Sequence, residues 1–213
     1  MGMMLTNNNG MLTGLVGPVV FVKGKNGEAI VRSKPVYKKK KLTPKRQLSC
    51  DRFTLGGDFI KPMYPFLKDS FTNFLGKRNA CNAVRSYSLT HAVKLEQGVP
   101  VIAYEKVLIS TGNIRSYQSL NQQLVTNGLY LQWDPDTHQA FAEPDDVLSV
   151  VVYVPVLEDY LFFKACALRE SGAITLELPA ECSQAGFHAW ATFANATQDE
   201  YAFSTYLGHF EAI

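Results

Sequence analysis

The chain has 213 residues, enough for one large domain or two small ones, and 46% hydrophobic with 19% charged residues is typical of a folded protein rather than a disordered one. Its net charge of +2 hides a division: residues 1–100 carry 17 Lys and Arg against 5 Asp and Glu, whereas residues 101–213 carry 4 against 14. No apolar run approaches the ~18 residues that span a bilayer, and the first residues lack the basic and apolar regions of a signal peptide, so we expect no membrane contact and a cytoplasmic protein, free or in an assembled particle.

The chain begins with a polar segment followed by a predicted β-hairpin. Residues 1–13 are polar and rich in methionine, and we expect them to be mobile in the isolated protein. The β-prone runs 19–22 and 29–32 are separated by Asn26-Gly27, a strong turn signal. Because a two-stranded hairpin is only marginally stable, we expect it to dock on another surface.

A basic segment overlaps the hairpin and continues beyond it. Within 24 residues the sequence places ten cations: Lys23, Lys25, Arg32, Lys34, Lys38, Lys39, Lys40, Lys41, Lys45 and Arg46. The compensating acids lie almost entirely in the other half of the chain, which favours a role for these cations beyond solvation. Only Tyr37 offers a stacking ring within the run, so the pattern does not indicate the reading of nucleic-acid bases.

Three helices are predicted next. Thr43-Pro44 is a helix-start signal for a first helix over 44–60, which the pair Gly56-Gly57 is expected to weaken, break or kink. Apolar positions spaced by three and four residues predict a second helix over 62–75. Asn79 is a suitable N-cap for a third helix to about residue 93.

From residue 99 the pattern changes to short β-prone runs separated by turn residues, at the spacing of an all-β sandwich. We expect strands near 101–109, 129–133, 147–154, 160–168, 173–178, 187–194 and 201–208. Seven short strands in about 110 residues favour an antiparallel, immunoglobulin-like β-sandwich. The predicted fold class is therefore α+β, with a flexible N-terminus, β-hairpin arm and basic linker over 1–47, a helical segment over 48–98 and a sandwich domain over 99–213.

The sequence contains no recognisable catalytic arrangement. No serine lies in a GxSxG motif, and no cysteine has an evident partner histidine. His91 lies on an apolar helical face and is expected to be buried, whereas His188 alternates with apolar residues and is expected to face solvent or pair across strands. We therefore predict no catalytic residues, no cofactor and no enzymatic activity.

A metal site is also not predicted. The four cysteines, at positions 50, 81, 166 and 182, form no CxxC pair and have no histidine pair nearby, so we expect reduced, mostly buried thiols. The acids of the 134–146 segment imitate the start of a calcium loop, but the downstream Gly and Glu of such a loop are absent. We interpret them as turn-forming and solvating residues.

Six short motifs are distributed along most of the chain: Gly14-Leu-Val-Gly-Pro-Val-Val20, Val31-Arg-Ser-Lys-Pro35, Thr43-Pro-Lys-Arg-Gln47, Asp51-Arg-Phe53, Asn82 to Tyr87 and Phe203 to Gly208. Together they resemble the motifs of an uncharacterised protein family, a domain of unknown function common in Bacteroidota. The resemblance implies a hairpin, basic linker, helices and sandwich in one folded protein, and it implies no activity.

The charge division and the small hairpin together predict a non-enzymatic structural protein that assembles with itself. The basic N-terminal arm of one copy would dock on the acidic body of the next, forming a ring, a filament or a phage-like particle. The arm contributes the ten cations with Val19, Val20, Phe21 and Val22, and the body contributes Asp145, Asp146, Glu158 and Asp159. The alternative is a nucleic-acid-associated protein that binds phosphates through residues 23–46, and the third is an enzyme whose site is built from scattered residues.

Overall fold

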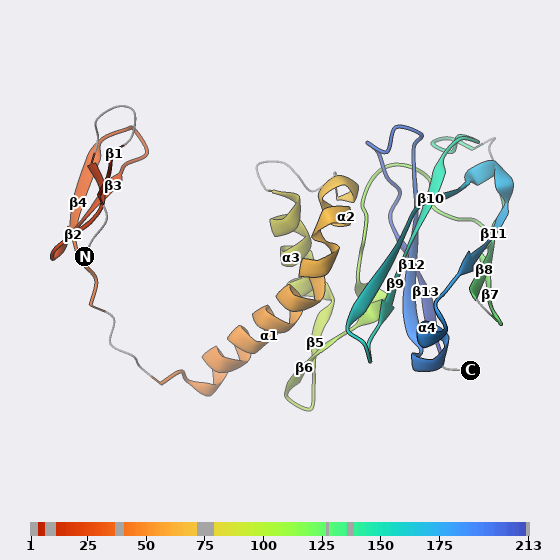
Figure 1. The fold of residues 1–213 in the computed structure, drawn as a ribbon, viewed down its shortest axis with the longest axis horizontal. Coiled ribbons are helices and arrows are strands. Elements are labelled where there is room, and N and C mark those ends of the chain that lie inside the picture. The colour runs from red at the N-terminus through yellow and green to blue at the C-terminus, as the bar shows by residue number, and fades with distance from the viewer. Residues whose placement is uncertain are drawn as a thin grey trace. The chain divides into compact units, whose positions relative to one another are not determined.

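The computed structural model of the chain describes residues 4–6, 12–36, 41–71, 79–126, 128–135 and 139–211. The chain forms two compact units, Met1–Thr43 and Pro44–Ile213. Figure 1 shows strands alone in the N-terminal unit, and both helices and strands in the second. The second unit therefore holds both the predicted helical segment and the predicted strands from residue 99 onward.

The N-terminal unit is one antiparallel sheet of four strands in the order β1-β2-β3-β4. Its strands are β1 (Met4–Thr6), β2 (Leu12–Val16), β3 (Val19–Lys23) and β4 (Ala29–Ser33). The predicted hairpin is confirmed, because β3 pairs with β4 from Val19 opposite Ser33 to Lys23 opposite Ala29. At its tip the Gly24 N–H donates to the Glu28 carbonyl at 2.7 Å, and Gly27 takes a φ of 89°, which suits glycine.

Two strands precede the hairpin. β1 pairs with β2, and β2 pairs with β3, with Val16 opposite Val19 across a tight turn. The strands β1 and β2 were not predicted within residues 1–13, whose expected mobility stays a prediction, while residues 1–3 and 7–11 lie outside the described residues. Pairing with the free edge of β3 satisfies backbone groups that a two-stranded hairpin would leave unpaired.

The second unit begins with helices. They are α1 (Pro44–Ile60), the short 3₁₀ helix η1 (Lys61–Met63), α2 (Tyr64–Ser70) and α3 (Ala80–His91). The predicted starts of α1 and α3 are confirmed, and the Asn79 side chain accepts a hydrogen bond from the Cys81 N–H at 2.9 Å. The second predicted helix ends earlier than expected, at Ser70. Within the described ranges, no helix has both the length and the apolar character to cross a membrane.

The remaining elements are mainly strands. They are β5 (Val93–Glu96), β6 (Val99–Ile102), η2 (Tyr104–Lys106), β7 (Asn121–Val125), β8 (Gly128–Gln132), β9 (Val147–Val154), β10 (Asp159–Leu168), η3 (Arg169–Ser171), β11 (Ala173–Glu177), α4 (Ala180–Ala185), β12 (Phe187–Ala194) and β13 (Thr205–Phe210). They form a four-stranded sheet β10-β9-β12-β13, a three-stranded sheet β11-β8-β7 and the hairpin β5-β6. The mixed α+β class is thus confirmed.

Several predicted strand bounds differ from the structure. The strand expected over 101–109 is β6, which ends at Ile102, and the strand expected from residue 201 begins at Thr205. β5 and β7 were not predicted. Most β7 residues are exposed at the edge of the three-stranded sheet, so the strand lacks the apolar alternation that marks a half-buried strand.

Both faces of the four-stranded sheet are buried. Along β9, Leu148, Val150 and Val152 join a cluster with the three-stranded sheet, whereas Val151 and Tyr153 join a second cluster with α1, α2 and α3. Figure 1 shows the same order, with α1, α2 and α3 on one side of β9 and β12 and the strands β7, β8 and β11 on the other. Alternating side chains of one strand therefore belong to two hydrophobic cores.

The helix pair against β5 explains the two central glycines of α1. A Cβ on Gly56 would lie 3.1 Å from the Val93 Cγ2 and 3.3 Å from the Leu89 Cδ2, so glycine lets α1 approach α3 and β5 closely. A Cβ on Gly57 would meet nothing within 4 Å. The expectation that this pair interrupts the helix is wrong, because packing against α3 and β5 stabilises α1 through these positions.

Candidate partner-binding site

The N-terminal sheet carries apolar residues on both faces. Directly opposite residues of an antiparallel pair point to the same side. The register therefore gathers Val16, Val19, Phe21 and Val31 on one face, and Leu15, Val20, Val22 and Ile30 on the other. None of residues 13–36 is buried, and Ile30 and Val31 are 44% and 54% exposed. Over these described residues the sheet has no core of its own, although its composition is that of a covered sheet.

The predicted basic residues lie on and beyond this sheet. Those that the structure describes are all exposed: Lys23, Lys25, Arg32, Lys34, Lys41, Lys45 and Arg46. Lys38, Lys39 and Lys40 lie outside the described residues. Among described residues, the ion pairs join Lys94 to Glu96 and Glu105, and Arg169 to Asp146, so none of them neutralises these seven cations.

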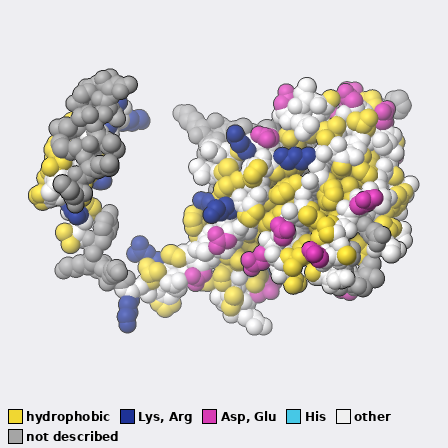
Figure 2. All heavy atoms as spheres, in the orientation of Figure 1, with side chains coloured by type: hydrophobic (Ala, Val, Ile, Leu, Met, Phe, Trp, Pro, Cys, Tyr) yellow, Lys and Arg dark blue, Asp and Glu magenta, His cyan; other side chains and the backbone are white. Residues whose placement is uncertain are grey.

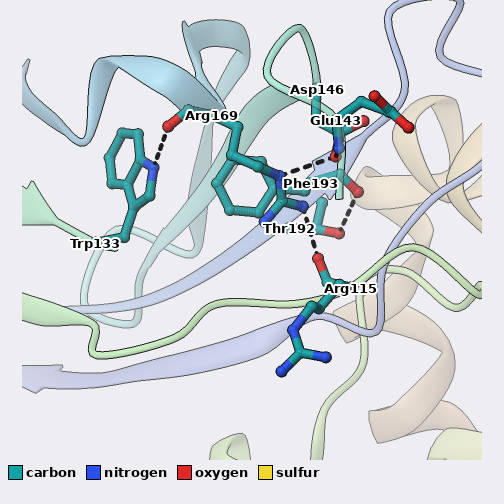
Figure 3. A network of polar contacts seen from close by, with 7 residues as sticks. All are labelled: Arg115, Trp133, Glu143, Asp146, Arg169, Thr192 and Phe193. Atoms are coloured by element: carbon teal, nitrogen blue, oxygen red, sulfur yellow. Dashed lines mark hydrogen bonds and ion pairs between the residues drawn. The ribbon is translucent and has the colours of Figure 1, made fainter. Parts of the chain in front are cut away.

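Asp146, predicted to be part of the acidic surface, is buried instead. Its carboxylate oxygen Oδ2 accepts hydrogen bonds from the Arg169 Nε at 2.9 Å and from the Glu143 N–H at 3.1 Å. Figure 3 shows the Arg169 guanidinium between this carboxylate and the ring of Phe193, whose centroid is 3.9 Å away. Both charged side chains are 3% exposed. Asp146 therefore fixes loops within the chain, and its carboxylate is not available to a partner.

The Arg169 backbone and guanidinium extend this network. The Arg169 Nη2 donates a hydrogen bond to the Arg115 carbonyl at 2.7 Å. The Arg169 backbone carbonyl accepts one from the Trp133 Nε1 at 2.8 Å. A buried guanidinium is tolerated because its Nε and Nη2 donate hydrogen bonds and one carboxylate neutralises it. The network thus ties the segment before β7, the residue that follows β8 and the loop before β9 to η3.

The other three predicted acids are exposed. Asp145 lies beside the buried Asp146, whereas Glu158 and Asp159 lie where β9 turns into β10. Glu158 takes a φ of 52°, in the left-handed region. The same turn exposes Val156 by 74% and Leu157 by 49%, so acidic and apolar side chains occur together there.

A cleft of about 360 Å³ opens next to this turn. Its lining includes four aromatic rings and two carboxylates, from Phe59, Tyr104, Tyr153, Tyr160, Asp58 and Glu158. Figure 2 shows acidic side chains among hydrophobic ones on the exposed face of the second unit. Of these six residues, only Glu158 was predicted as a site residue.

The aromatic rings pack around Phe59, which lies near the end of α1. Its ring meets Tyr153 at 5.2 Å and 84°, and Tyr104 at 5.8 Å and 61°, both edge-to-face geometries. The Tyr160 hydroxyl donates to the Phe59 carbonyl at 2.6 Å, which fixes β10 against the helix. The walls of the cleft are therefore held by contacts between α1, η2 and the β9–β10 hairpin.

The tyrosines of the cleft stay neutral at physiological pH. Burial, with smaller contributions from Tyr104 and Glu158, raises the pKa of Tyr153 to about 12. Burial also raises the pKa of Tyr160. Among the residues that line the cleft, the carboxylates of Asp58 and Glu158 are then the formal charges, and the cleft is negative with apolar walls.

Two histidine expectations have different outcomes. His188 is buried rather than solvent-facing, but the predicted cross-strand pair is confirmed, because it lies opposite His209 with ring centroids 4.6 Å apart. His91 was expected to be buried and is exposed, with its ring 4.6 Å from that of Tyr87. The inward face of α3 instead consists of Ala80, Ala83, Val84 and Ser88.

The described thiols and acids form neither a reactive nor a metal-binding arrangement. Cys166 is half-buried, and burial raises its pKa to about 11, so its thiol is protonated at neutral pH. Cys50 is exposed, which differs from the expected burial. Across the described ranges, no three His, Cys, Asp or Glu side chains lie together as metal ligands, and Asp136 and His138 fall outside those ranges.

Residues 11–208 match the model of a family described as a family of unknown function (DUF6266). No curated protein and no solved structure matches the chain. The matched range runs from β2 into β13 and so includes the hairpin, the helices and both larger sheets. The resemblance to an uncharacterised family, which the sequence motifs indicated, is confirmed.

Proposed function

We propose that this chain, which belongs to the family of unknown function DUF6266, is a non-enzymatic structural protein that assembles with itself. The N-terminal sheet and basic segment of one copy dock on the acidic second unit of the next copy. Because the two surfaces differ, the contact is heterologous, and its repetition gives a ring, a filament or a phage-like particle.

The observation that carries the proposal is the apolar N-terminal sheet without a buried residue among residues 13–36. Both of its faces present valine, isoleucine, leucine or phenylalanine side chains. Covering such a face removes apolar surface from water, and each Å² that is buried contributes about 25 cal/mol to the free energy of association. An exposed apolar sheet therefore favours association. A neighbouring copy can cover this face, because it is present at the same concentration as the sheet itself.

Charge supports the choice of a second copy as the partner. The described cations of the arm have no ion-pair partner within the described chain, and most acids lie after residue 100. The first turn of α1 contains Lys45 and Arg46 and no acid, so two positive charges lie at the positive end of the helix dipole. An acidic partner surface would relieve that repulsion.

The apolar residues of the arm contribute the remaining specificity. β4 is an edge strand whose five residues are all exposed, and β10 is an edge of the four-stranded sheet. Adding one strand to such an edge is a common mode of peptide recognition. Val19, Val20, Phe21 and Val22 of β3 lie beside β4 and complete the docking surface.

On the body, the proposed contact uses Glu158 and Asp159 at the β9–β10 turn, while Asp145, which precedes β9 and so lies at the other end of that strand, would make a separate contact. Asp146 is excluded because Arg169 already neutralises it in the interior. The exposed Val156 and Leu157 at the same turn give this surface an apolar centre with acidic neighbours. The free thiols fit the cytoplasm or an assembled particle as the location.

We also propose that the sheets of the second unit form an immunoglobulin-like sandwich. With β7 to β13 named A to G, the sheets are A-B-E and D-C-F-G. A constant-type immunoglobulin domain groups A, B, E and D against C, F and G, so only the fourth strand, β10, differs in its sheet. A crystal structure in which the two sheets do not face one another would contradict this proposal.

Charge reversal tests the self-assembly. We expect nuclease-treated protein to form large particles at low salt, measured by sedimentation velocity and negative-stain electron microscopy. Lys23→Glu with Lys25→Glu, or Glu158→Lys with Asp159→Lys, should each reduce assembly. Mixing the two variants should restore it, because the reversed arm then meets the reversed body. A wild-type protein that stays monomeric at low salt and high concentration would refute the proposal.

The nucleic-acid alternative predicts a different pattern. The same exposed cations would neutralise phosphates, and affinity for labelled single-stranded DNA or RNA would fall steeply with salt and depend little on sequence. Alanine at the four lysines 38–41 would abolish that binding, and reversal of the body acids would not rescue it. If the protein binds nucleic acid in this way and stays monomeric, nucleic-acid binding rather than self-assembly is its function.

A further inference from the structure

The cleft beside Phe59 combines aromatic walls with carboxylates, and this combination has a specific ligand chemistry. We propose that the cleft receives one lysine side chain from a second copy, and that Lys25 at the tip of the β3–β4 hairpin supplies it. The assignment rests on the proposed self-assembly and names the residue that the acidic body recognises. It extends the contact from a general attraction between charges to one defined receptor.

The lining favours a cation. Faces of tyrosine and phenylalanine rings attract an ammonium group, and the attraction grows when the group leaves water. Tyr153 and Tyr160 are each 9% exposed and their ring centroids lie 4.6 Å apart, so these residues form a largely dry wall. Asp58 and Glu158 lie in the same lining and supply the counter-charge.

The same lining disfavours other ligands. Phosphate would be repelled by the two carboxylates, since neither a lysine nor an arginine is among the nine lining residues. A divalent cation prefers six or more oxygen ligands, and the described residues hold no group of three ligating side chains. An alkylammonium fits, because its apolar stem lies along the rings while its charged head reaches the carboxylates.

The hairpin tip is suited to enter a concave site. Lys25 is exposed in the turn between Gly24 and Gly27, and the paired strands β3 and β4 hold that turn. Lys34, which follows β4, is equally exposed and carries the same charge, but it extends from no turn. Shape therefore favours Lys25, whereas net charge alone would favour neither.

The first experiment measures binding of a lysine analogue to the full chain by tyrosine fluorescence and NMR. We expect Nα-acetyl-lysine methylamide to bind roughly five- to thirtyfold more tightly than the neutral Nα-acetyl-norleucine methylamide. Tyr104→Leu and Glu158→Gln should each remove most of this preference. Glu177→Gln, at an exposed acid of β11 outside the cleft lining, should leave it unchanged. Equal affinity for the two amides would overturn the proposal.

The second experiment identifies the source of the lysine through the assembly. Lys25→Ala should weaken self-association by roughly tenfold and Lys34→Ala by much less, as measured by sedimentation velocity. Glu158→Gln should cause little further loss of self-association in the Lys25→Ala background, because the two substitutions remove the same contact. Additive losses, or equal effects of the two lysine variants, would overturn the assignment of Lys25.

The two experiments separate the two proposals. If the lysine analogue binds but the wild-type protein never assembles, self-assembly and Lys25 are both wrong, and the cleft is a site for a free amine. If the protein assembles but binds the lysine and norleucine amides equally, and Lys25→Ala weakens assembly no more than Lys34→Ala, self-assembly stands. The cleft is then not the site that receives a lysine from the next copy.

Discussion

His188 stacks on Tyr104, with ring centroids 3.8 Å apart and an angle of 21° between the rings. Its Nδ1 also lies 2.7 Å from the Tyr206 hydroxyl oxygen. Burial, reinforced by the neighbouring His209, lowers the pKa of His188 from 6.5 to about 4. The histidine is therefore held neutral behind the aromatic wall of the cleft.

This neutral histidine predicts a pH-dependent stability. His188 binds a proton with a pKa near 6.5 in the unfolded chain, but only with a pKa of about 4 in the folded chain. The free energy of unfolding therefore falls as the pH decreases through that window. Allowing for partial solvent access, we expect the histidine to contribute about 1–3 kcal/mol to the loss. His188→Phe keeps a ring and should flatten the dependence measured by urea unfolding between about pH 7 and pH 5. His91→Phe, at an exposed site, should retain the wild-type slope.

Removal of one partner of the buried ion pair should destabilise the second unit strongly. Asp146→Ala leaves the Arg169 guanidinium, 3% exposed, without its counter-charge. We expect the free energy of unfolding to fall by about 3–5 kcal/mol in urea titrations. Asp145→Ala changes the exposed neighbour and should alter the value by less than about 0.5 kcal/mol. Similar losses in both variants would contradict a structural role specific to Asp146.

The adjacent glycines of α1 provide a matched pair. Gly57→Ala adds a Cβ where nothing lies within 4 Å and should stabilise the protein by about 0.5–1 kcal/mol through helix propensity. Gly56→Ala gains the same propensity but places a Cβ 3.1 Å from the Val93 side chain. We expect it to be less stable than Gly57→Ala by about 1 kcal/mol or more in thermal and urea unfolding. Equal stability of the two variants would mean that α3 and β5 can move to accommodate the added Cβ without loss of stability.

The apolar faces of the N-terminal sheet predict a separation of assembly from stability. Ile30→Ser should weaken self-association by roughly tenfold, because the side chain would lose its cover in the assembly. Leu95→Ser changes a residue of matching exposure, 45% against 44%, on the β5–β6 hairpin. It should leave sedimentation unchanged. Both variants should keep the unfolding transition of the second unit, as followed by circular dichroism.

Local signals were sufficient where neighbouring residues determine the backbone. Asn26-Gly27 predicted the β3–β4 turn, Thr43-Pro44 the start of α1, and Asn79 the start of α3. Gly27 adopts the positive φ of the turn, the Pro44 ring fixes the backbone at the start of α1, and the Asn79 side chain accepts a hydrogen bond from the Cys81 N–H two positions away. Such signals do not depend on the rest of the fold.

The cleft, and the choice of which face of α3 is buried, depend instead on contacts between residues distant in sequence. The hydrogen bond from Tyr160 to Phe59 joins residues 101 positions apart, and no periodicity records which strand meets which helix. His91 shares the spacing of an inward face, yet packing against α1 and α2 selects Ser88 and exposes His91. The charge division identified Glu158 as a candidate, whereas nothing local marked Phe59 or Tyr104.

The two-sided burial of β9 has a consequence for how the second unit unfolds. Neighbouring residues of this strand, such as Val150 and Val151, belong to different hydrophobic clusters, so neither cluster can open while the strand keeps its place. The helices and the three-stranded sheet share this one wall and should melt in a single cooperative transition. A fragment that ends before β9 would then lose both cores at once, and neither half of the unit would survive as an independent folding module.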